Sequence, residues 1–348
     1  MIDSHWHVYV PEHEDGRDFR IVLDELQKRQ NLEALNICCI PCYQDLGPAQ
    51  NILAAIYKLH NPTAYAYGGL VYPDKPLKMP MPEGMDPLSQ YEELMGIGFD
   101  GIKMLETKPT EQKIYEVCID DPYFAPFFKA CEQDGTHTVW HVADPEMFWD
   151  IDRIPKRHLD RGWYYGDGTY MSYDRVYEQV YNVLEQCPQL KVTFAHFFFL
   201  SEHPERLEEL FAKYPGATVD LTPGAEMYQA FVDNRAYYRD FFIKYQDRIL
   251  FGTDTSYRGQ TDMERFHQRS DAVRRFLETD EQMTVIDVTT KGLALPKAAC
   301  KKILGENFQK VAGKKPRPID RAKLRAYVEK YKHLITDENM LTYILQNV

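Results

Sequence analysis

The feature of this sequence that most constrains its fold is an eightfold alternation of short apolar runs with amphipathic segments. Apolar runs of roughly four to eight residues bounded by turn residues are typical of buried parallel strands. Eight strand and helix repeats favour a closed (β/α)8 TIM barrel, an α/β fold, over a doubly wound sheet. The strands are expected near residues 2–8, 35–40, 64–71, 99–105, 137–142, 191–197, 217–221 and 248–253.

Residues that begin and end helices stand where the alternation places helix boundaries. Asp86-Pro87 and Asp121-Pro122 are typical of an N-cap residue followed by proline in the first turn. Gly135 stands where a helix is expected to give way to the next strand. These local signals agree with the strands predicted on either side of them.

The length of the chain suits one large barrel with loop insertions. Beyond the eighth strand, amphipathic patterns predict further helices near residues 262–278, 295–312 and 319–347. We therefore expect a single domain over residues 1–348, with the barrel over about residues 1–280 and a C-terminal helical extension over about residues 281–348.

The charge and hydropathy of the chain indicate a small-molecule substrate. The formal net charge is −12 and the isoelectric point is near 5.4, whereas non-specific attraction to nucleic acid or anionic membrane needs a basic surface. The N-terminus has no basic segment followed by an apolar stretch, and no run approaches the roughly 20 apolar residues of a membrane helix. We expect a cytoplasmic protein without nucleic-acid or membrane partners.

The cysteines predict no disulfide framework. The chain has seven, mostly scattered, and large chains with scattered cysteines seldom depend on disulfides. Cys39 and Cys42 form a C-x-x-C pair, but no second pair completes a zinc site. We expect reduced, mostly buried thiols.

The first expected strand carries side chains that suit a metal ion. Asp3, His5 and His7 are spaced two residues apart, so an extended chain points all three to the same side. Two imidazoles at this spacing can bind one metal ion. This segment therefore predicts the nucleus of a metal site.

Three further candidate ligands stand at the ends of other apolar runs. His141 ends the fifth expected strand, His196 ends the sixth, and Asp254 follows the eighth. In a parallel barrel the catalytic groups gather at the C-terminal ends of the strands. We therefore expect these three side chains to converge with His5 and His7.

This set of residues, in this order along the strands, resembles the amidohydrolase superfamily. The nearer resemblance is to its amidohydrolase-related branch, which also contains aminocarboxymuconate-semialdehyde decarboxylase. Residues 248–254 and 302–307 are similar to segments of family members, and the similarity spans nearly the whole chain. It implies a metal-dependent TIM-barrel enzyme.

The expected metal ligands are His5, His7, His141 and Asp254. Neutral imidazoles and one carboxylate leave a divalent ion with an open position for water, whose pKa the ion lowers from about 15.7 toward roughly 7. Asp254 is placed to take a proton from that water and pass it to the leaving group, a role the resemblance also implies. His196 either binds a second ion or polarises the substrate carbonyl. Zinc is the first expectation, with manganese and iron as alternatives.

Lys103 ends the fourth expected strand, where two-metal members of the superfamily carry a carboxylated lysine. A lysine beside cations resists protonation, and carboxylation needs the neutral amine. Alternatively, Lys103 binds a substrate carboxylate or pairs with Asp3 or Glu106. We expect one metal ion; in the two-metal alternative, Lys103 and His196 become ligands.

The longest loop, near residues 142–172, is rich in aromatic residues and carries two arginines. Long loops without regular structure are often functional. One interpretation is a lid whose rings enclose the substrate and whose arginines bind a carboxylate; the other is a contact with the second subunit of a homodimer. The expected substrate-binding residues are Lys103, Trp149, Arg153, Arg157 and Arg258.

Three smaller signals stand near the expected strand ends. Asp220 lies inside the seventh strand, and a buried carboxylate there needs partners, so one interpretation is that it orients a metal ligand. Glu226 and Arg258 follow the seventh and eighth strands, where each either reaches the pocket or is a solvated loop charge.

Two functions use the expected site. The first is metal-dependent hydrolysis of a C–N or C–O bond in a small amide, lactone or ester, which we favour because hydrolases are widespread in the superfamily. The alternative is a decarboxylase, a carbon–carbon lyase that uses the same metal with an arginine for the departing carboxylate. A barrel that only binds a ligand is poorly motivated, because every expected metal ligand is present.

Overall fold

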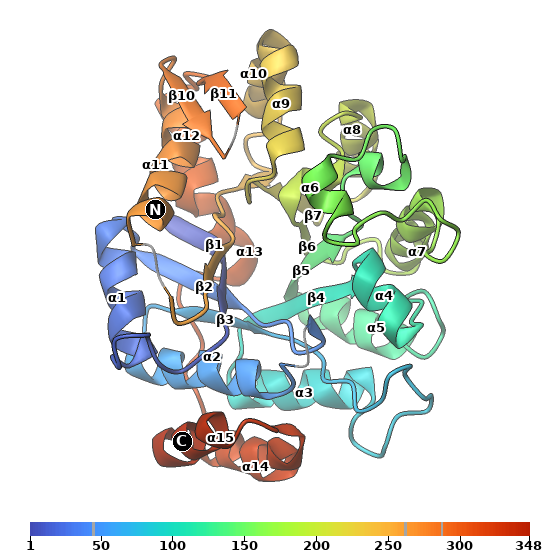
Figure 1. The fold of residues 1–348 in the computed structure, drawn as a ribbon, viewed down its shortest axis with the longest axis vertical. Helices are drawn as coiled ribbons and strands as arrows, with labels where there is room; N and C mark the ends of the chain where they lie inside the picture. Colours follow the sequence, from blue (N-terminus) through green and yellow to red (C-terminus); the bar gives the residue numbers. More distant parts are fainter. Residues whose placement is uncertain (44–45, 261–262, 287) are drawn as a thin grey trace.

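A computed structural model describes residues 1–43, 46–260, 263–286 and 288–348. Its centre is a parallel sheet with the strand order β8-β7-β6-β5-β4-β3-β2-β1-β9. The sheet curls into the TIM barrel expected from the sequence (Figure 1). The strands are β1 (Ile2–Val8), β2 (Ala34–Cys38), β3 (Tyr65–Gly68), β4 (Gly101–Thr107), β5 (His137–Val142), β6 (Val192–Phe194), β7 (Ala217–Asp220), β8 (Ile249–Leu250) and β9 (Thr255–Tyr257).

Helices surround the sheet, and a small hairpin follows the helix after β9 (Figure 1). The helices up to that hairpin are α1 (Phe19–Arg29), α2 (Ala49–His60), α3 (Pro87–Ile97), α4 (Pro109–Tyr115), α5 (Ala125–Asp134), α6 (Lys156–Leu159), α7 (Tyr173–Gln186), α8 (Pro204–Lys213), α9 (Ala225–Asp233), α10 (Arg235–Lys244) and α11 (Met263–Glu278). The hairpin and the later helices are β10 (Gln282–Val285), β11 (Val288–Lys291), α12 (Lys297–Lys301), α13 (Asn307–Ala312), α14 (Arg321–Tyr331) and α15 (Glu338–Asn347). In the described part of the chain, no helix has both the length and the apolar content to cross a membrane.

The last two helices form part of the C-terminal helical extension expected over about residues 281–348, whose start is instead the strands β10 and β11. Helices α14 and α15 lie beneath α2 and α3, outside the helices that cover the sheet (Figure 1). The connection to them is tied to the barrel by Asp100, which accepts hydrogen bonds from Lys58 Nζ at 2.5 Å and from the Arg317 backbone N–H at 2.7 Å. Because the Lys58 and Asp100 side chains are buried, each needs the other as a partner.

The barrel closes between β1 and the segment that follows β8. Ser4 N–H donates to the Phe251 carbonyl at 3.0 Å, and β9 pairs with the second half of β1. The sequence analysis predicted a strand near 248–253; the structure has the shorter β8 there, and β9 is a further strand beyond the predicted range. The chain leaves the extended conformation at Asp254, whose φ is +54°.

The expected helix boundaries are confirmed at one proline and wrong at another. Asp86 caps α3, accepting from the Ser89 N–H at 3.0 Å, and Pro87 is the first helical residue. Asp121 instead accepts from the Tyr123 N–H at 2.8 Å in a turn, and α5 begins at Ala125. Asx turns and N-caps use the same side-chain hydrogen bond, so the sequence pattern does not separate them.

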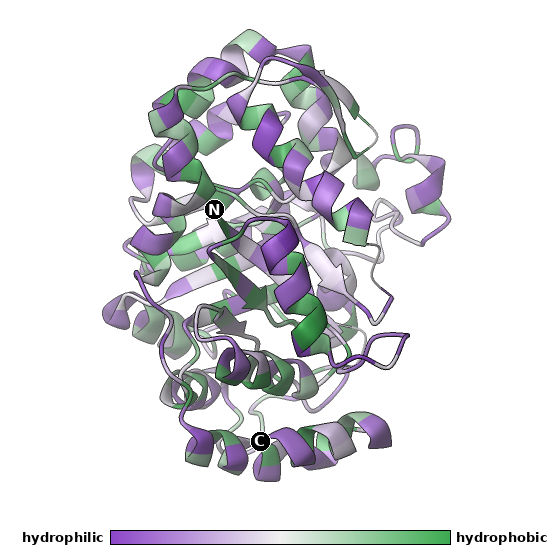
Figure 2. Cartoon of the chain, turned by 90° about the vertical axis from the view of Figure 1, so that its left-hand side faces the viewer, coloured by the Kyte–Doolittle hydropathy of each residue, from purple (hydrophilic) through white to green (hydrophobic). Residues whose placement is uncertain are grey.

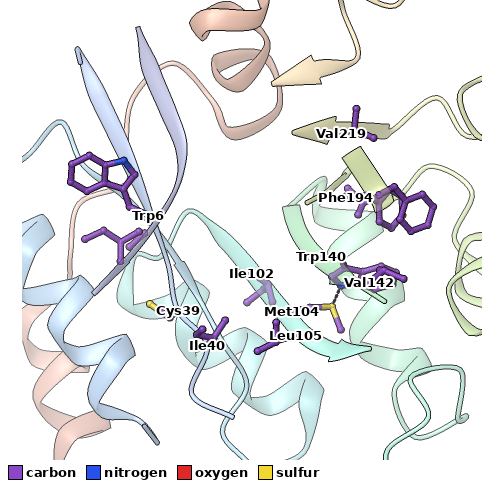
Figure 3. Close-up of a cluster of buried hydrophobic side chains, with 14 of the residues drawn as sticks. Trp6, Cys39, Ile40, Ile102, Met104, Leu105, Trp140, Val142, Phe194 and Val219 are labelled. Atoms are coloured by element: carbon purple, nitrogen blue, oxygen red, sulfur yellow. Dashed lines mark hydrogen bonds between the residues drawn. The ribbon is translucent and has the colours of Figure 1, made fainter. Parts of the chain in front are cut away.

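The core lies between the sheet and the helices. Trp6, Trp140 and Phe194 are fully buried on β1, β5 and β6, and the rings of Trp140 and Phe194 are 5.9 Å apart (Figure 3). The outer helices carry both hydrophilic and hydrophobic faces (Figure 2). Burial of the apolar faces stabilises the barrel by about 25 cal/mol for each Å² removed from water.

Candidate active site

His7 on β1 presents one ring nitrogen to Asp254. Its Nδ1 lies 2.6 Å from the Cys38 carbonyl oxygen on β2, and a carbonyl can only accept, so Nδ1 carries the proton. In the neutral form of the ring, the lone pair is therefore on Nε2, which lies 3.2 Å from Asp254 Oδ1. The backbone of the neighbouring strand thus fixes His7 in the tautomer that binds a metal through Nε2.

His5 is held in the same way by a carboxylate. Its Nδ1 lies 2.9 Å from Asp220 Oδ2 at the end of β7. Burial opposes ionisation of Asp220, but the hydrogen bond and charge of His5 lower its pKa to about 2. Asp220 is therefore a carboxylate that accepts from Nδ1, and the lone pair of His5 is on Nε2. The sequence analysis considered this orienting contact for Asp220, and the structure contains it.

The fourth strand brings a lysine to the other side of the His5 ring. Lys103 Nζ lies 3.1 Å from His5 Nε2, and both side chains are buried. Burial and then the Lys103 charge lower the pKa of His5 to about 3. Burial also lowers the pKa of Lys103. His5 is therefore a neutral ring at pH 7.

Asp254 completes a group that can hold a metal ion. One ligand atom each from His5, His7 and Asp254 lies within 4.8 Å of the others. Burial opposes ionisation of Asp254, but its contacts with His7, and then with His5 and His196, hold its pKa well below the usual value. Two imidazole nitrogens with lone pairs and one carboxylate form a donor set that fits zinc, manganese or iron.

Asp3 has a different role from its two neighbours on β1. Its carboxylate accepts from Thr253 Oγ1 at 2.6 Å and from the Thr253 and His5 N–H groups at 3.1 and 3.2 Å. It therefore fastens β1 to the residue that precedes Asp254. Burial raises the pKa of Asp3 to about 6.

His141 and His196 lie against each other in the same cavity. Their ring centroids are 4.9 Å apart, and the His196 ring is 6.1 Å from that of His5. Neither histidine belongs to the 4.8 Å group of His5, His7 and Asp254. Burial lowers the pKa of both His141 and His196 to about 4, so both are neutral at pH 7.

His196 begins a turn with an unusual backbone. Residues 196–199 have φ of +56°, +55°, +60° and +50°, a left-handed conformation that costs a residue with a Cβ roughly 1–2 kcal/mol. The His196 N–H donates to Asp220 Oδ1 at 2.9 Å, and Nδ1 lies 3.2 Å from the Thr222 carbonyl oxygen. Nδ1 therefore carries the proton and Nε2 the lone pair, which suits the neutral ring to accept a proton or bind a cation.

The candidate ligands line a cavity of 180 Å³. The cavity is lined by His5, His7, Tyr9, Ile40, Tyr43, Lys103, Leu105, Lys108, His141, Trp163, His196, Asp254, Ser256 and Arg258. Among these described residues, the lysines and Arg258 are cations and Asp254 is the one carboxylate. A small cavity with this excess of positive side chains suits a small anionic molecule.

Two of the expected substrate-binding residues, Lys103 and Arg258, line the cavity. Arg258 follows β9, and its guanidinium carbon lies 3.7 Å from the centre of the Tyr9 ring. Stacking on an aromatic ring fixes the plane of a guanidinium group.

The other three expected substrate-binding residues are not among the residues that line the cavity. Arg153 is exposed and lies 3.1 Å from a carboxylate oxygen of Glu202. Trp149 donates from Nε1 to the Met171 carbonyl at 3.0 Å, and Arg157 donates from Nε to His158 Nε2 at 3.1 Å. The loop reaches the cavity through Trp163 instead.

Lys108 is the cavity residue that the sequence analysis missed most clearly. It follows the last residue of β4 directly and is buried. The same positional rule that selected His141 and Asp254, a polar side chain at the end of an apolar run, applies to Lys108. Tyr9, one residue beyond the end of β1, meets the rule as well.

Glu226, which the sequence analysis placed near the pocket, is not among the residues that line the cavity. Burial raises its pKa to about 7. Its Oε1 has no hydrogen-bond partner among the described residues.

Comparison with known proteins identifies a family. The amidohydrolase family model matches residues 76–311. This stretch contains Lys103, His141, His196 and Asp254 and begins after β1. No curated protein sequence matches the chain.

Solved structures share the fold at low identity. An uncharacterised TIM-barrel protein from Bordetella bronchiseptica is 13% identical, with 90% of this chain and 100% of that chain covered and a TM-score of 0.54. A 2,6-dihydroxybenzoate decarboxylase from Rhizobium is 15% identical, with 89% and 98% covered and a TM-score of 0.53. A dihydroxybenzoic acid decarboxylase from Polaromonas, with bound manganese and the inhibitor 2-nitroresorcinol, is 15% identical, with 89% and 96% covered and a TM-score of 0.52. At these identities the likeness establishes the TIM-barrel fold.

Proposed function

The chain belongs to the amidohydrolase family, and we propose that it is a metal-dependent hydrolase that cleaves a C–N or C–O bond of a small carboxylate-bearing substrate. The bond belongs to an amide, a lactone or an ester. The observation that carries the proposal is the group of His5, His7 and Asp254, whose ligand atoms lie within 4.8 Å of one another. These residues also line the cavity at the C-terminal ends of the strands, where TIM-barrel enzymes bind their substrates.

In this proposal one divalent cation is held by His5, His7 and Asp254, with His141 completing the set. Zinc is our first choice because it suits imidazole and carboxylate ligands, and manganese is the alternative because the Polaromonas decarboxylase contains it. When bound, such a cation supplies Lewis acidity and makes a water molecule easier to deprotonate.

Asp254 is the proposed general base and acid. Its carboxylate is held ionised, with Oδ1 3.2 Å from His7 Nε2. It takes a proton from water and delivers that proton to the leaving nitrogen or oxygen. The neutral ring of His196 carries its lone pair on Nε2, so this nitrogen either accepts a proton or binds a second cation. His196 can polarise a substrate carbonyl only after it has been protonated.

The positive side chains of the cavity bind the substrate carboxylate in this proposal. Lys103 on β4 and Arg258 after β9 both line the cavity that contains the residues proposed to hold the cation. Charge-assisted hydrogen bonds from a guanidinium group to a carboxylate are bidentate and orient the bound molecule.

Decarboxylation is the second candidate. The excess of cations in the cavity favours it, because Lys103, Lys108 or Arg258 can hold a carboxylate until it leaves. Two of the similar structures are decarboxylases whose chains are covered to 98% and 96%. In this reaction the bond to the carboxyl carbon breaks, carbon dioxide leaves, and a proton replaces it on the substrate carbon.

A substrate panel before and after chelation tests both functions. The panel contains small lactones, esters and amides together with aromatic carboxylates such as 2,6-dihydroxybenzoate, and carbon dioxide is measured alongside acid release. Hydrolysis that disappears on chelation and returns with zinc or manganese supports the proposed function. Carbon dioxide release without hydrolysis favours the lyase, and metal-independent turnover contradicts both.

A further inference from the structure

Three polar side chains meet at Asp144, two residues beyond the end of β5. Lys108 Nζ lies 2.7 and 2.6 Å from the two carboxylate oxygens. Tyr165 Oη donates to Oδ2 at 2.7 Å, and His141 Nε2 lies 3.4 Å from Oδ1. Asp144, Lys108 and Tyr165 are all buried, so this network lies away from solvent, where charge-assisted hydrogen bonds are strong.

The hydrogen bonds to Asp144 determine which ring nitrogen of His141 carries the proton. Burial opposes ionisation of Asp144, but the adjacent Lys108 ammonium holds its pKa below the usual value. The carboxylate therefore only accepts, and both the Tyr165 hydroxyl and His141 Nε2 donate to it. A neutral His141 with its proton on Nε2 has its lone pair on Nδ1. The contact with Asp144 thus sets the nitrogen with which His141 can bind a cation or accept a proton.

The same carboxylate connects the barrel to the long loop. Tyr165 lies in that loop and packs with Phe148 and Ile154 in a hydrophobic cluster separate from the main core. Lys108 Nζ also lies 5.3 Å from the centre of the Trp163 ring, which lines the cavity. Contacts from Asp144 and Lys108 therefore join the loop to β4 and β5 beside the cavity.

We propose that Asp144 is a positioning residue that holds His141 in its Nε2–H tautomer and latches residues 145–172 beside the cavity through Tyr165. The position of the loop and the tautomer of His141 then both depend on the Asp144 carboxylate. The loop residue Trp163 therefore lines the cavity only when Tyr165 is hydrogen-bonded to Asp144. The inference rests on the proposed function, because it takes His141 to face the reacting groups. It adds a residue, Asp144, that bears on the reaction through His141 and the loop.

Nitrogen NMR of ¹⁵N-histidine-labelled protein tests the tautomer. The His141 signal is assigned with His141→Gln, and the full-length protein is measured with its metal. In the wild-type protein we expect the proton on Nε2, and Asp144→Asn, whose amide can also donate, is expected to shift the His141 population towards the Nδ1–H form. A wild-type His141 with its proton on Nδ1 overturns the proposal even if Asp144→Asn does not fold.

Amide hydrogen exchange tests the latch. Tyr165→Phe removes only the hydroxyl that donates to Asp144, so we expect exchange in residues 145–172 to become roughly ten- to a hundredfold faster, the range for a hydrogen bond to a charged group. Tyr91→Phe is the matched control, because Tyr91 donates to Asp134 at 2.8 Å outside the cavity. Equal exchange of the loop in wild type and Tyr165→Phe overturns the latch.

Neither measurement needs a substrate. A loop that loosens in Tyr165→Phe and a His141 tautomer that changes in Asp144→Asn support the positioning role even if the substrate panel finds no hydrolysis. The converse result is that the protein hydrolyses a substrate while neither the loop exchange nor the His141 tautomer changes in these variants. That result supports the proposed function and contradicts the role proposed for Asp144.

Discussion

Neutral histidines with defined tautomers are the main chemical feature of the cavity. The Cys38 carbonyl accepts a hydrogen bond from Nδ1 of His7, and the Asp220 carboxylate accepts one from Nδ1 of His5. In the neutral form of each ring the lone pair is therefore on Nε2. Burial then holds His5 neutral. Metal binding to His5 therefore does not have to remove a proton from that ring at pH 7, which favours high affinity.

Asp254→Asn is the substitution that tests the proposed general base. It keeps the size of the side chain and removes its charge, so kcat should fall by roughly 10²- to 10⁴-fold. Thermal unfolding should show that the fold is retained. Asp74→Asn, at a half-buried residue paired with the exposed Lys78 and outside the cavity, is the matched control and should leave kcat unchanged. An Asp254→Asn enzyme with wild-type kcat would contradict the role proposed for Asp254.

At the residue scale, the sequence could predict the location of those candidate ligands that lie along a strand or follow its C-terminal end. The placement of His5, His7 and Asp254 follows from alternation along β1 and from the end of β8. The partners that set their proton positions come from other strands. The Cys38 carbonyl is a backbone group, and no side-chain pattern in a single sequence reveals it.

At the scale of elements, the loops after the strands hold two segments in strained backbone. The turn after β6 keeps four successive residues at positive φ, and Asp254 after β8 has a φ of +54°. Bonds from buried carboxylates compensate: Asp220 accepts from the His196 N–H, and Asp3 binds Thr253. Such strain is commonly concentrated at functional sites.

Paired substitutions at Phe199 test the left-handed turn. Its φ of +50° penalises any residue with a Cβ, so Phe199→Gly should be more stable than Phe199→Ala by about 1 kcal/mol, opposite to the order in a helix. Both variants lose the same ring contact with His196, so the difference isolates the backbone. The free energy of unfolding in denaturant measures it. An alanine variant as stable as the glycine variant would count against the turn.

Element boundaries separate what the sequence could and could not predict. The strands at 2–8 and 137–142 have those bounds, because each is a continuous buried run. The additional strand β9 was missed because it is held by pairing with β1, a contact between distant parts of the chain. The start of α5 was missed because Asp121 forms a turn with the same local chemistry as a cap.

At the scale of the whole molecule, buried neutral histidines make stability depend on pH. His137, inside the barrel, lies 2.7 Å from Tyr67 Oη and 2.8 Å from Thr193 Oγ1. Burial lowers its pKa from 6.5 to about 3. Between those two values only the unfolded chain binds the proton, so His137 stabilises the fold above about pH 6.5 and this contribution is lost as pH falls toward 3.

His137→Gln tests this acid sensitivity. When only the unfolded chain binds a proton at one site, the free energy of unfolding falls by about 1.4 kcal/mol for each pH unit of acidification. Between pH 6.5 and pH 4, the pH dependence of the variant should therefore be smaller than that of the wild type by up to this amount. The free energy of unfolding is measured in denaturant across this range. His333→Gln, at an exposed histidine, is the control and should keep the wild-type slope. A His137→Gln variant with an unchanged slope would show that His137 does not carry the effect.

The barrel as a whole was predictable because the alternation of strands and helices repeats over most of the chain. The C-terminal extension followed from the amphipathic segments beyond the eighth strand. The closing contact of the barrel, from the Ser4 N–H to Phe251, depends on residues 247 positions apart. Such a contact follows from the closed topology and leaves no local signal.

Metal content per chain tests the central claim most directly. Wild-type protein and a His5→Asn/His7→Asn double variant are purified without added metal and measured by elemental analysis, with unfolding recorded to show that both are folded. We predict close to one divalent ion per wild-type chain and no stoichiometric ion in the variant. Equal metal content in the two folded proteins, or none in the wild type even after zinc or manganese is supplied, would contradict a metal site at His5, His7 and Asp254.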